Sequence, residues 1–359
     1  MFSKIIKSYF KNLYIFFIFL SLYLFFFSTV KVEGKSFDIT NIEISEPFEM
    51  NFNKNIVIDE GFKKAFSELL SLIVNSTDKK KIGTIQLKEI KSMIESFSIK
   101  EEKFIDNIYF LNLGVSFNKK EVFSYLEKNN IFPSIPVKKK ILFIPVIIDE
   151  NKKELLIFSN NKVFENWNNQ IKKTHLINYI LPTDDLEDLM IIKKNFETIE
   201  EYSFDEIIKK YDLKDSIISL IFKNENEIRI LSKISIKENT ILKNQSLKNI
   251  NFGNDEQVQK IIDILKNSYE DYWKNLNKIN TSIKLPINIK IQNLDNHLIM
   301  NFEKILKDID LVYDFSIKKF DNKYIYYQII FNGTPNIFLD TMLSKNYKFD
   351  TRNKVWILE

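Results

Sequence analysis

An uncharged apolar stretch near the start of the chain limits its fold more than any other feature. Leu13–Val30 contains apolar residues with scattered Tyr, Ser and Thr, and it follows Lys4, Lys7 and Lys11. A core helix of a globular protein would normally have a polar face, which this stretch lacks. A basic flank followed by an apolar run is typical of an export signal or of a membrane anchor.

The length of this stretch leaves both kinds of leader open. At about 1.5 Å per residue it spans roughly 27 Å, slightly less than a bilayer core of ~30 Å but more than a usual signal core. Val32-Glu33-Gly34 offers a cleavage site, so residues 1–34 are expected to be a signal peptide, or an N-terminal membrane anchor if uncleaved. The positive-inside rule places the rest of the chain in the periplasm or on the periplasmic face of the inner membrane.

The composition excludes several classes of protein. The chain has no Cys, which rules out disulfides, thiolate metal sites and Cys nucleophiles. Lys and Arg total 52 against 48 Asp and Glu, and the arginines are Arg229 and Arg352. A nucleic-acid-binding protein concentrates Arg and Lys on one face, so we predict no nucleic-acid partner. Hydrophobic residues make up 45% of the chain, which is enough for packed cores.

The first segment after the leader predicts an N-terminal α+β domain at residues 35–135. Its pattern indicates a strand, two helices, a strand and a helix, at residues 37–44, 58–74, 85–97, 108–117 and 118–126. Phe62, Phe66 and Leu69 recur at helical spacing and predict one buried face on the first helix. Asn118 is expected to cap the last helix, with Glu121 in the capping-box position.

A proline-containing linker at Ile131–Lys140 precedes a predicted middle α/β domain at residues 136–281. The continuous apolar run Ile141–Ile148 predicts a strand buried on both faces. Further strands alternate with helices expected at 164–171, after Pro182, at 204–211 and at 256–279, which favours a helix-covered sheet.

Residues 282–359 predict a small C-terminal α+β domain. The order is strand, helix, two strands, helix and two short strands, with the central elements at 295–309, 311–317, 324–331 and 335–343. The predicted fold class is therefore α+β or α/β: an exported multi-domain protein of small sheets covered by helices, after an N-terminal hydrophobic signal or anchor helix.

Several of these segments together resemble a known family. They are "GFKKAFSELLSLIV", "NIYFLNLGVSFNKKEVFSYLEKNNI", "KKKILFIPVII", "LPTDDLEDLMII" and "YIYYQIIFNGTPNIFLDTMLSKNYKF". The set is similar to the bacterial envelope family named domain of unknown function two thousand and sixty-six, and "FENWNN" is an imperfect counterpart of its Trp- and Asn-containing motif. The resemblance implies an exported protein of Gram-negative type and supplies no catalytic residues.

The segment "LPTDDLEDL" carries Asp184, Asp185, Glu187 and Asp188 beside a proline. Clustered carboxylates can bind Ca²⁺ or Mg²⁺, so Asp184, Asp185 and Asp188 are candidate metal ligands. The favoured interpretation is that Thr183 caps a helix and the acidic residues complement the positive end of its dipole. The spacing matches no EF-hand loop, and we predict no metal site.

Other residue types give little support to catalysis. His175 and His297 are the only histidines, which excludes a multi-His zinc site, and no serine-nucleophile motif accompanies them. None of the 6 glycines forms a phosphate loop, so no cofactor is predicted. Trp167 and Trp273 are candidates for a binding surface, and the charged neighbours of Trp273 suggest a partly exposed helix.

Two functions follow from these patterns. The first is a non-enzymatic binding or assembly module facing the periplasm, with an envelope protein or a cell-wall component as partner. The alternative is a periplasmic hydrolase that uses the Asp184–Asp188 carboxylates in acid/base or metal-assisted chemistry.

Overall fold

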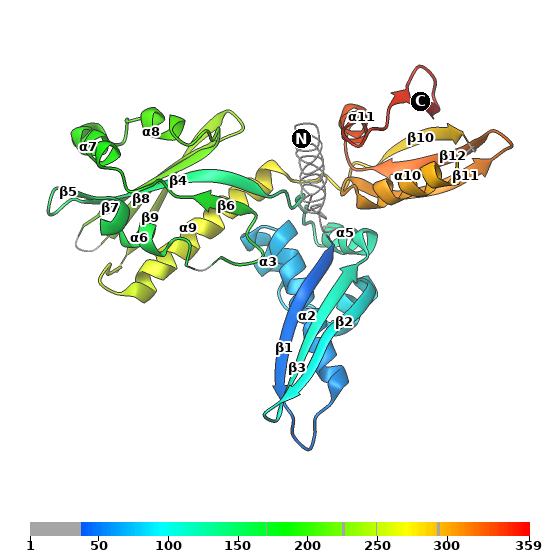
Figure 1. Ribbon diagram of the computed structural model, residues 1–359, viewed down its shortest axis with the longest axis horizontal. Coiled ribbons are helices and arrows are strands. Elements are labelled where there is room, and N and C mark those ends of the chain that lie inside the picture. The colour runs from blue at the N-terminus through cyan, green and yellow to red at the C-terminus, as the bar shows by residue number, and fades with distance from the viewer. Residues whose placement is uncertain (1–36, 170, 225–226, 249, 293–294) are drawn as a thin grey trace, which may run out of the picture. The chain divides into compact units, whose positions relative to one another are not determined.

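The computed structural model describes residues 37–169, 171–224, 227–248, 250–292 and 295–359 (Figure 1). Within these ranges the strands form three sheets, and the fold is mixed α+β. Each sheet lies within one of the three predicted ranges, and their division into separate domains stays a prediction. The predicted leader lies outside the described residues. None of the helices described here combines the length and the apolar character needed to cross a bilayer.

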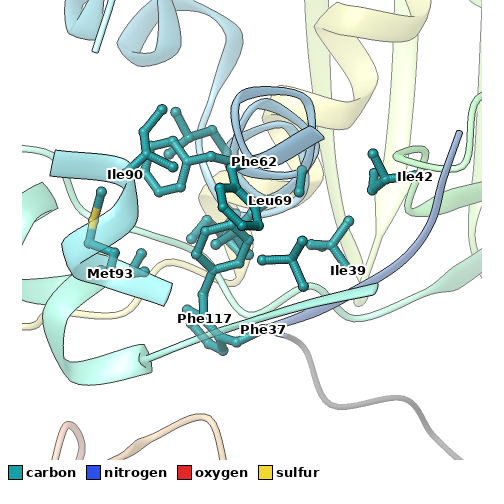
Figure 2. Packing of buried hydrophobic residues seen from close by; sticks show 14 of the residues in the cluster. Phe37, Ile39, Ile42, Phe62, Leu69, Ile90, Met93 and Phe117 are labelled. Atoms are coloured by element: carbon teal, nitrogen blue, oxygen red, sulfur yellow. The ribbon is translucent and has the colours of Figure 1, made fainter. Parts of the chain in front are cut away.

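The first sheet has three antiparallel strands in the order β1-β3-β2. The strands are β1 (Asp38–Pro47), β2 (Ile94–Ile105) and β3 (Ile108–Phe117), and the helices around them are α2 (Lys54–Ile73), α3 (Ser76–Ile82), α4 (Leu87–Met93) and α5 (Lys119–Lys128). Figure 2 shows α2 beside the sheet, and Phe62 and Leu69 of the helix belong to the same buried cluster as Ile39 and Phe117. One face of the sheet is therefore covered.

Helix α2 confirms the predicted buried face. Asn53 caps it by accepting a hydrogen bond from the Asn55 N–H, so the helix begins at Lys54, four residues before the predicted start. The buried side has a helical spacing and consists of Val57, Gly61, Phe62, Ala65, Phe66, Leu69, Leu70 and Ile73. Asn118 caps α5 as predicted, since its side chain accepts from the Lys120 and Glu121 N–H groups.

The predicted helix at 85–97 is wrong in its last part. Helix α4 ends at Met93, and β2 starts at the next residue. The cause is the two-residue turn at Asp106 and Asn107, whose φ values of 51° and 60° are those required by a tight hairpin. This turn pairs β2 with β3, so the strand forms although its own polar sequence shows little alternation.

The second sheet has the order β5-β4-β7-β8-β9, with β6 also paired to β4. Its strands are β4 (Lys139–Asp149), β5 (Glu154–Leu156), β6 (Ile177–Ile180), β7 (Ser216–Lys223), β8 (Glu227–Ile236) and β9 (Asn239–Lys248). β4 is parallel to β6 and β7, and the other pairs are antiparallel. The apolar run of β4 is buried on both faces, as predicted.

Apolar side chains from helices pack against both faces of this sheet. α6 (Lys162–Asn166) and α9 (Asp255–Leu276) contribute to the cluster that contains Phe143. α7 (Leu186–Lys194) and α8 (Asp205–Lys209) contribute to the cluster that contains Ile144. Two short 3₁₀ helices, Phe158–Asn160 and Phe196–Thr198, complete the connections. α6 starts earlier than predicted because the Asn161 side chain accepts hydrogen bonds from the Val163 and Phe164 N–H groups, and it ends at Asn166.

The third sheet has the order β11-β12-β10-β14-β13. Its elements are β10 (Leu285–Gln292), α10 (Asn296–Asp308), β11 (Val312–Phe320), β12 (Tyr324–Phe331), α11 (Pro335–Ser344), β13 (Phe349–Asp350) and β14 (Trp356–Leu358). β12 lies between β10 and β11 and is antiparallel to both, so α10 joins two parallel strands in a split βαβ unit. The predicted element order is confirmed.

Candidate functional site

The acidic cluster begins helix α7, but not at the predicted residue. Asp185 is the cap, with its Oδ1 accepting the Glu187 N–H at 2.8 Å. The prediction that Thr183 caps this helix is wrong. The Thr183 N–H donates to the Tyr211 hydroxyl at 2.7 Å, which keeps Thr183 outside the helix.

An ammonium group of the chain lies among the carboxylates. Lys210 Nζ is 2.6 Å from Asp188 Oδ1, 3.2 Å from Glu187 Oε2 and 3.3 Å from Asp185 Oδ2. These hydrogen bonds raise the pKa of Lys210 above its usual value. Asp188 is fully buried, so the ion pair neutralises a charge that would otherwise be costly.

This arrangement does not bring the candidate metal ligands to a shared ion site. Lys210 already occupies the position where Asp185 and Asp188 converge, and Asp184 instead accepts a hydrogen bond from Ser159 Oγ at 3.0 Å. In the described part of the chain, no group of three or more His, Asp or Glu side chains is placed to hold a metal. The cluster links the start of α7 to the end of α8.

The two candidate tryptophans lie in the core. Trp167 has no exposed surface and stacks on Phe143 with ring centroids 3.8 Å apart. Trp273 is 2% exposed, and its Nε1–H donates to the Val137 carbonyl at 2.7 Å. Helix α9 is partly exposed, as expected, but it turns the Trp273 side chain inward. Both candidate rings are therefore buried, whereas a stacking surface would need them exposed.

The two histidines differ in their surroundings. His297 is exposed, and its Nδ1 is 3.1 Å from Asn301 Nδ2. His175 is partly buried, and burial together with Lys266 and Lys172 lowers its pKa to about 4. His175 precedes a segment held by Glu270, whose carboxylate accepts the Leu176 and Ile177 N–H groups at 3.0 Å each. Burial raises the pKa of Glu270.

The strongest candidate for a binding surface is the side of the first sheet opposite α2, here called the open face. The strand register arranges its side chains in three rows: Glu43, Asn112 and Glu101; Ser45, Phe110 and Lys103; Pro47, Ile108 and Ile105. The alternation of side chains along β3 explains this arrangement. Tyr109, Leu111 and Leu113 point to the α2 core, so the residues between them point to the open face.

Apolar side chains are exposed on the open face. Ile105 is 50% exposed, Phe110 38% and Ile108 37%. They adjoin a hollow of about 270 Å³, whose lining includes Phe110, Ile105 and Asn112 with Glu43 and Glu101. An exposed apolar patch with a polar rim is typical of a protein-binding surface.

The rim of the hollow is acidic. Glu43 and Glu101 stand on either side of Asn112, and Lys103 already pairs with Glu101 at 2.5 Å. Sequence reasoning missed this site because it did not place β2 beside β3. The Asp106-Asn107 pair was the signal that could have revealed it, because Asp and Asn are residue types that adopt the positive φ of a tight hairpin turn.

Comparison with known proteins identifies no family for this chain. No family model matches the chain, and no curated protein matches it. The resemblance to the envelope family rests on the quoted segments and stays a prediction.

Proposed function

We propose that this chain is an exported envelope protein that acts as a non-enzymatic binding or assembly module facing the periplasm. The open face of the first sheet carries this proposal. Its exposed Ile105, Ile108 and Phe110 form a surface beside a hollow, and burial of such side chains is the main driving force of protein association.

The chemistry of the rim indicates the kind of partner. Lys103 pairs with Glu101, so the lining of the hollow keeps one carboxylate in excess, that of Glu43. We therefore expect an envelope protein that presents apolar side chains flanked by Lys or Arg, since complementary charge orients an encounter and excludes wrong partners. A cell-wall component is the competing occupant.

Photo-crosslinking in intact cells of the source organism tests this surface. Replacing Phe110 with p-benzoylphenylalanine in the full chain should give, on illumination, a discrete adduct heavier than the 42.8 kDa chain. The matched control is Phe320, which is 76% exposed at the end of β11 and should give no such adduct. Ile108→Glu should reduce the Phe110 adduct at least fivefold, because it places a charge in the adjacent row of the apolar surface.

The identity of the adduct separates the occupants. A single partner protein supports the proposal. An adduct of heterogeneous mass that cell-wall hydrolases shorten, or equal labelling from Phe110 and Phe320, would each contradict it.

Export is a separate expectation that rests on residues 1–34. Alkaline phosphatase fused after Glu359 should be active, because its disulfides form only in an oxidising compartment. The same fusion without residues 1–34 should be inactive. A mature N-terminus at Lys35, measured by mass spectrometry, identifies a cleaved signal, and an intact N-terminus identifies a membrane anchor that attaches the protein to the membrane. Activity of both fusions would refute a role of this segment in export.

A further inference from the structure

Strand β2 is a long edge strand. It runs from Ile94 to Ile105, and among the described strands β3 is its neighbour on one side while the other side has none (Figure 1). From Glu95 to Ile105 every residue is exposed. An edge of this length presents backbone N–H and C=O groups that can pair with another strand.

The edge also leaves apolar side chains half-covered on the α2 side of the sheet. Phe97 is 49% exposed, Ile99 39% and Phe104 54%, whereas Leu113 and Val115 in the neighbouring strand are 0% and 1% exposed. The Phe97 ring packs against that of Phe62, with the ring centroids 5.1 Å apart, and half of its surface stays exposed. The apolar layer under α2 is therefore incomplete along β2.

A bulge in β2 determines which side chains share a face. The register shifts between Ile99 and Glu101, where Ile99 is opposite Leu113 and Glu101 is opposite Asn112. Phe97 and Ile99 before the bulge lie on the α2 side, and so do Glu102 and Phe104 after it. Lys100 and Glu101 both lie on the open face, where the Lys100 chain passes over Gly114.

We propose that two copies of this chain associate by antiparallel pairing of their β2 strands, which joins two three-stranded sheets into one of six strands. In the proposed register Lys100 is opposite Glu101 of the second copy, Ser98 is opposite its Lys103, and Phe97 is opposite its Phe104. The twofold axis repeats each pair. This association goes beyond the proposed function and uses the edge of the sheet, so Ile108 and Phe110 of β3 stay exposed on the open face.

Face and charge together select this register. Pairing keeps α2-side residues opposite α2-side residues at every position only when Lys100 is opposite Glu101, because the bulge changes the alternation there. Moving the second strand by two residues places Lys100 opposite Lys103, and like charges directly opposite are unfavourable. The proposed register instead places opposite charges together and brings four Phe rings into the incomplete apolar layer.

A charge exchange tests the association in the full chain, purified in detergent, by light scattering over a range of concentrations. K100E should place two acidic side chains opposite each other twice per dimer, and E101K should do the same with two basic side chains. Each should weaken dimerisation about tenfold. The double variant K100E/E101K restores opposite charges and should dimerise as the unchanged chain does. Both residues are exposed, so these changes leave the core intact.

Cysteine pairs test the register, because the chain has no other Cys. The variant Ser98→Cys/Lys103→Cys should form an oxidised dimer, since these positions are opposite across the interface and too far apart within one strand to bridge. The control Glu95→Cys/Ser98→Cys should give at least tenfold less, because in this register neither position lies near residue 95 or 98 of the second copy. A chain that is monomeric at all concentrations, a dimer indifferent to the charge exchange, or equal crosslinking of both cysteine pairs would overturn the proposal.

Discussion

Leu69→Ala should destabilise the chain by about 2–5 kcal/mol, the range measured for leucines truncated in well-packed cores. Leu69 has no exposed surface and lies between α2 and the first sheet (Figure 2). The loss has two parts, the transfer of the apolar side chain and the cavity that remains. Urea denaturation of the full chain, followed by circular dichroism, measures it as a lower midpoint.

The matched control lies on the same helix. Ile56 is 59% exposed, so Ile56→Ala removes a similar apolar group from the opposite side of α2. It should change stability by less than about 0.5 kcal/mol, as surface substitutions usually do. Similar losses from the two variants would mean that the packing of α2 is not as described.

Elements that are buried on one or both faces were predictable, and exposed edges were not. The face of α2 repeats at helical spacing, and β4 is one continuous apolar run, because packing demands these patterns. β2 and β9 were missed because they lie at the edges of their sheets, where solvent accepts polar residues such as Lys, Glu, Asn and Ser at most positions. Their pairing partners, not their own sequences, make them strands.

The exposure of single side chains in the candidate site was equally hard to predict from the sequence. Trp273 was a candidate for a binding surface because its charged neighbours in the sequence suggest a partly exposed helix. In the structure those neighbours are buried too, with Glu270 bound to backbone N–H groups and Lys274 Nζ donating to the Val74 carbonyl at 3.1 Å. The hydrogen-bond partners of these buried charged groups come from segments that are distant in sequence. The charge of neighbouring residues in the sequence therefore does not predict whether a side chain is exposed. The open face likewise exists only after three separate strands pair.

The environment of His175 predicts a pH-dependent loss of stability. Burial, followed by the nearby Lys266 and Lys172, lowers the pKa of this ring from 6.5 to about 4, while Asp263 opposes the change. Near pH 7 the ring is neutral in both the folded and unfolded chains. Below pH 6.5 the unfolded chain binds a proton that the folded chain does not, so stability falls as the pH falls toward about 4.

The size of this effect can be isolated by difference. One pKa unit corresponds to about 1.4 kcal/mol, and partial exposure of the ring reduces the full value, so we expect a loss on the order of 1–2 kcal/mol between pH 7 and pH 4. Carboxylates also titrate in this range, and the raised pKa of Glu270 acts in the opposite direction, because a buried acid is stabilised by protonation.

Comparison of the unchanged chain with His175→Gln cancels these shared contributions. The variant should lose less stability on acidification, measured as the unfolding free energy at each pH. His297→Gln, which removes an exposed ring, should follow the unchanged chain. If His175→Gln also followed it, the ring would carry its proton equally well in the folded state, and the description of its surroundings would be wrong.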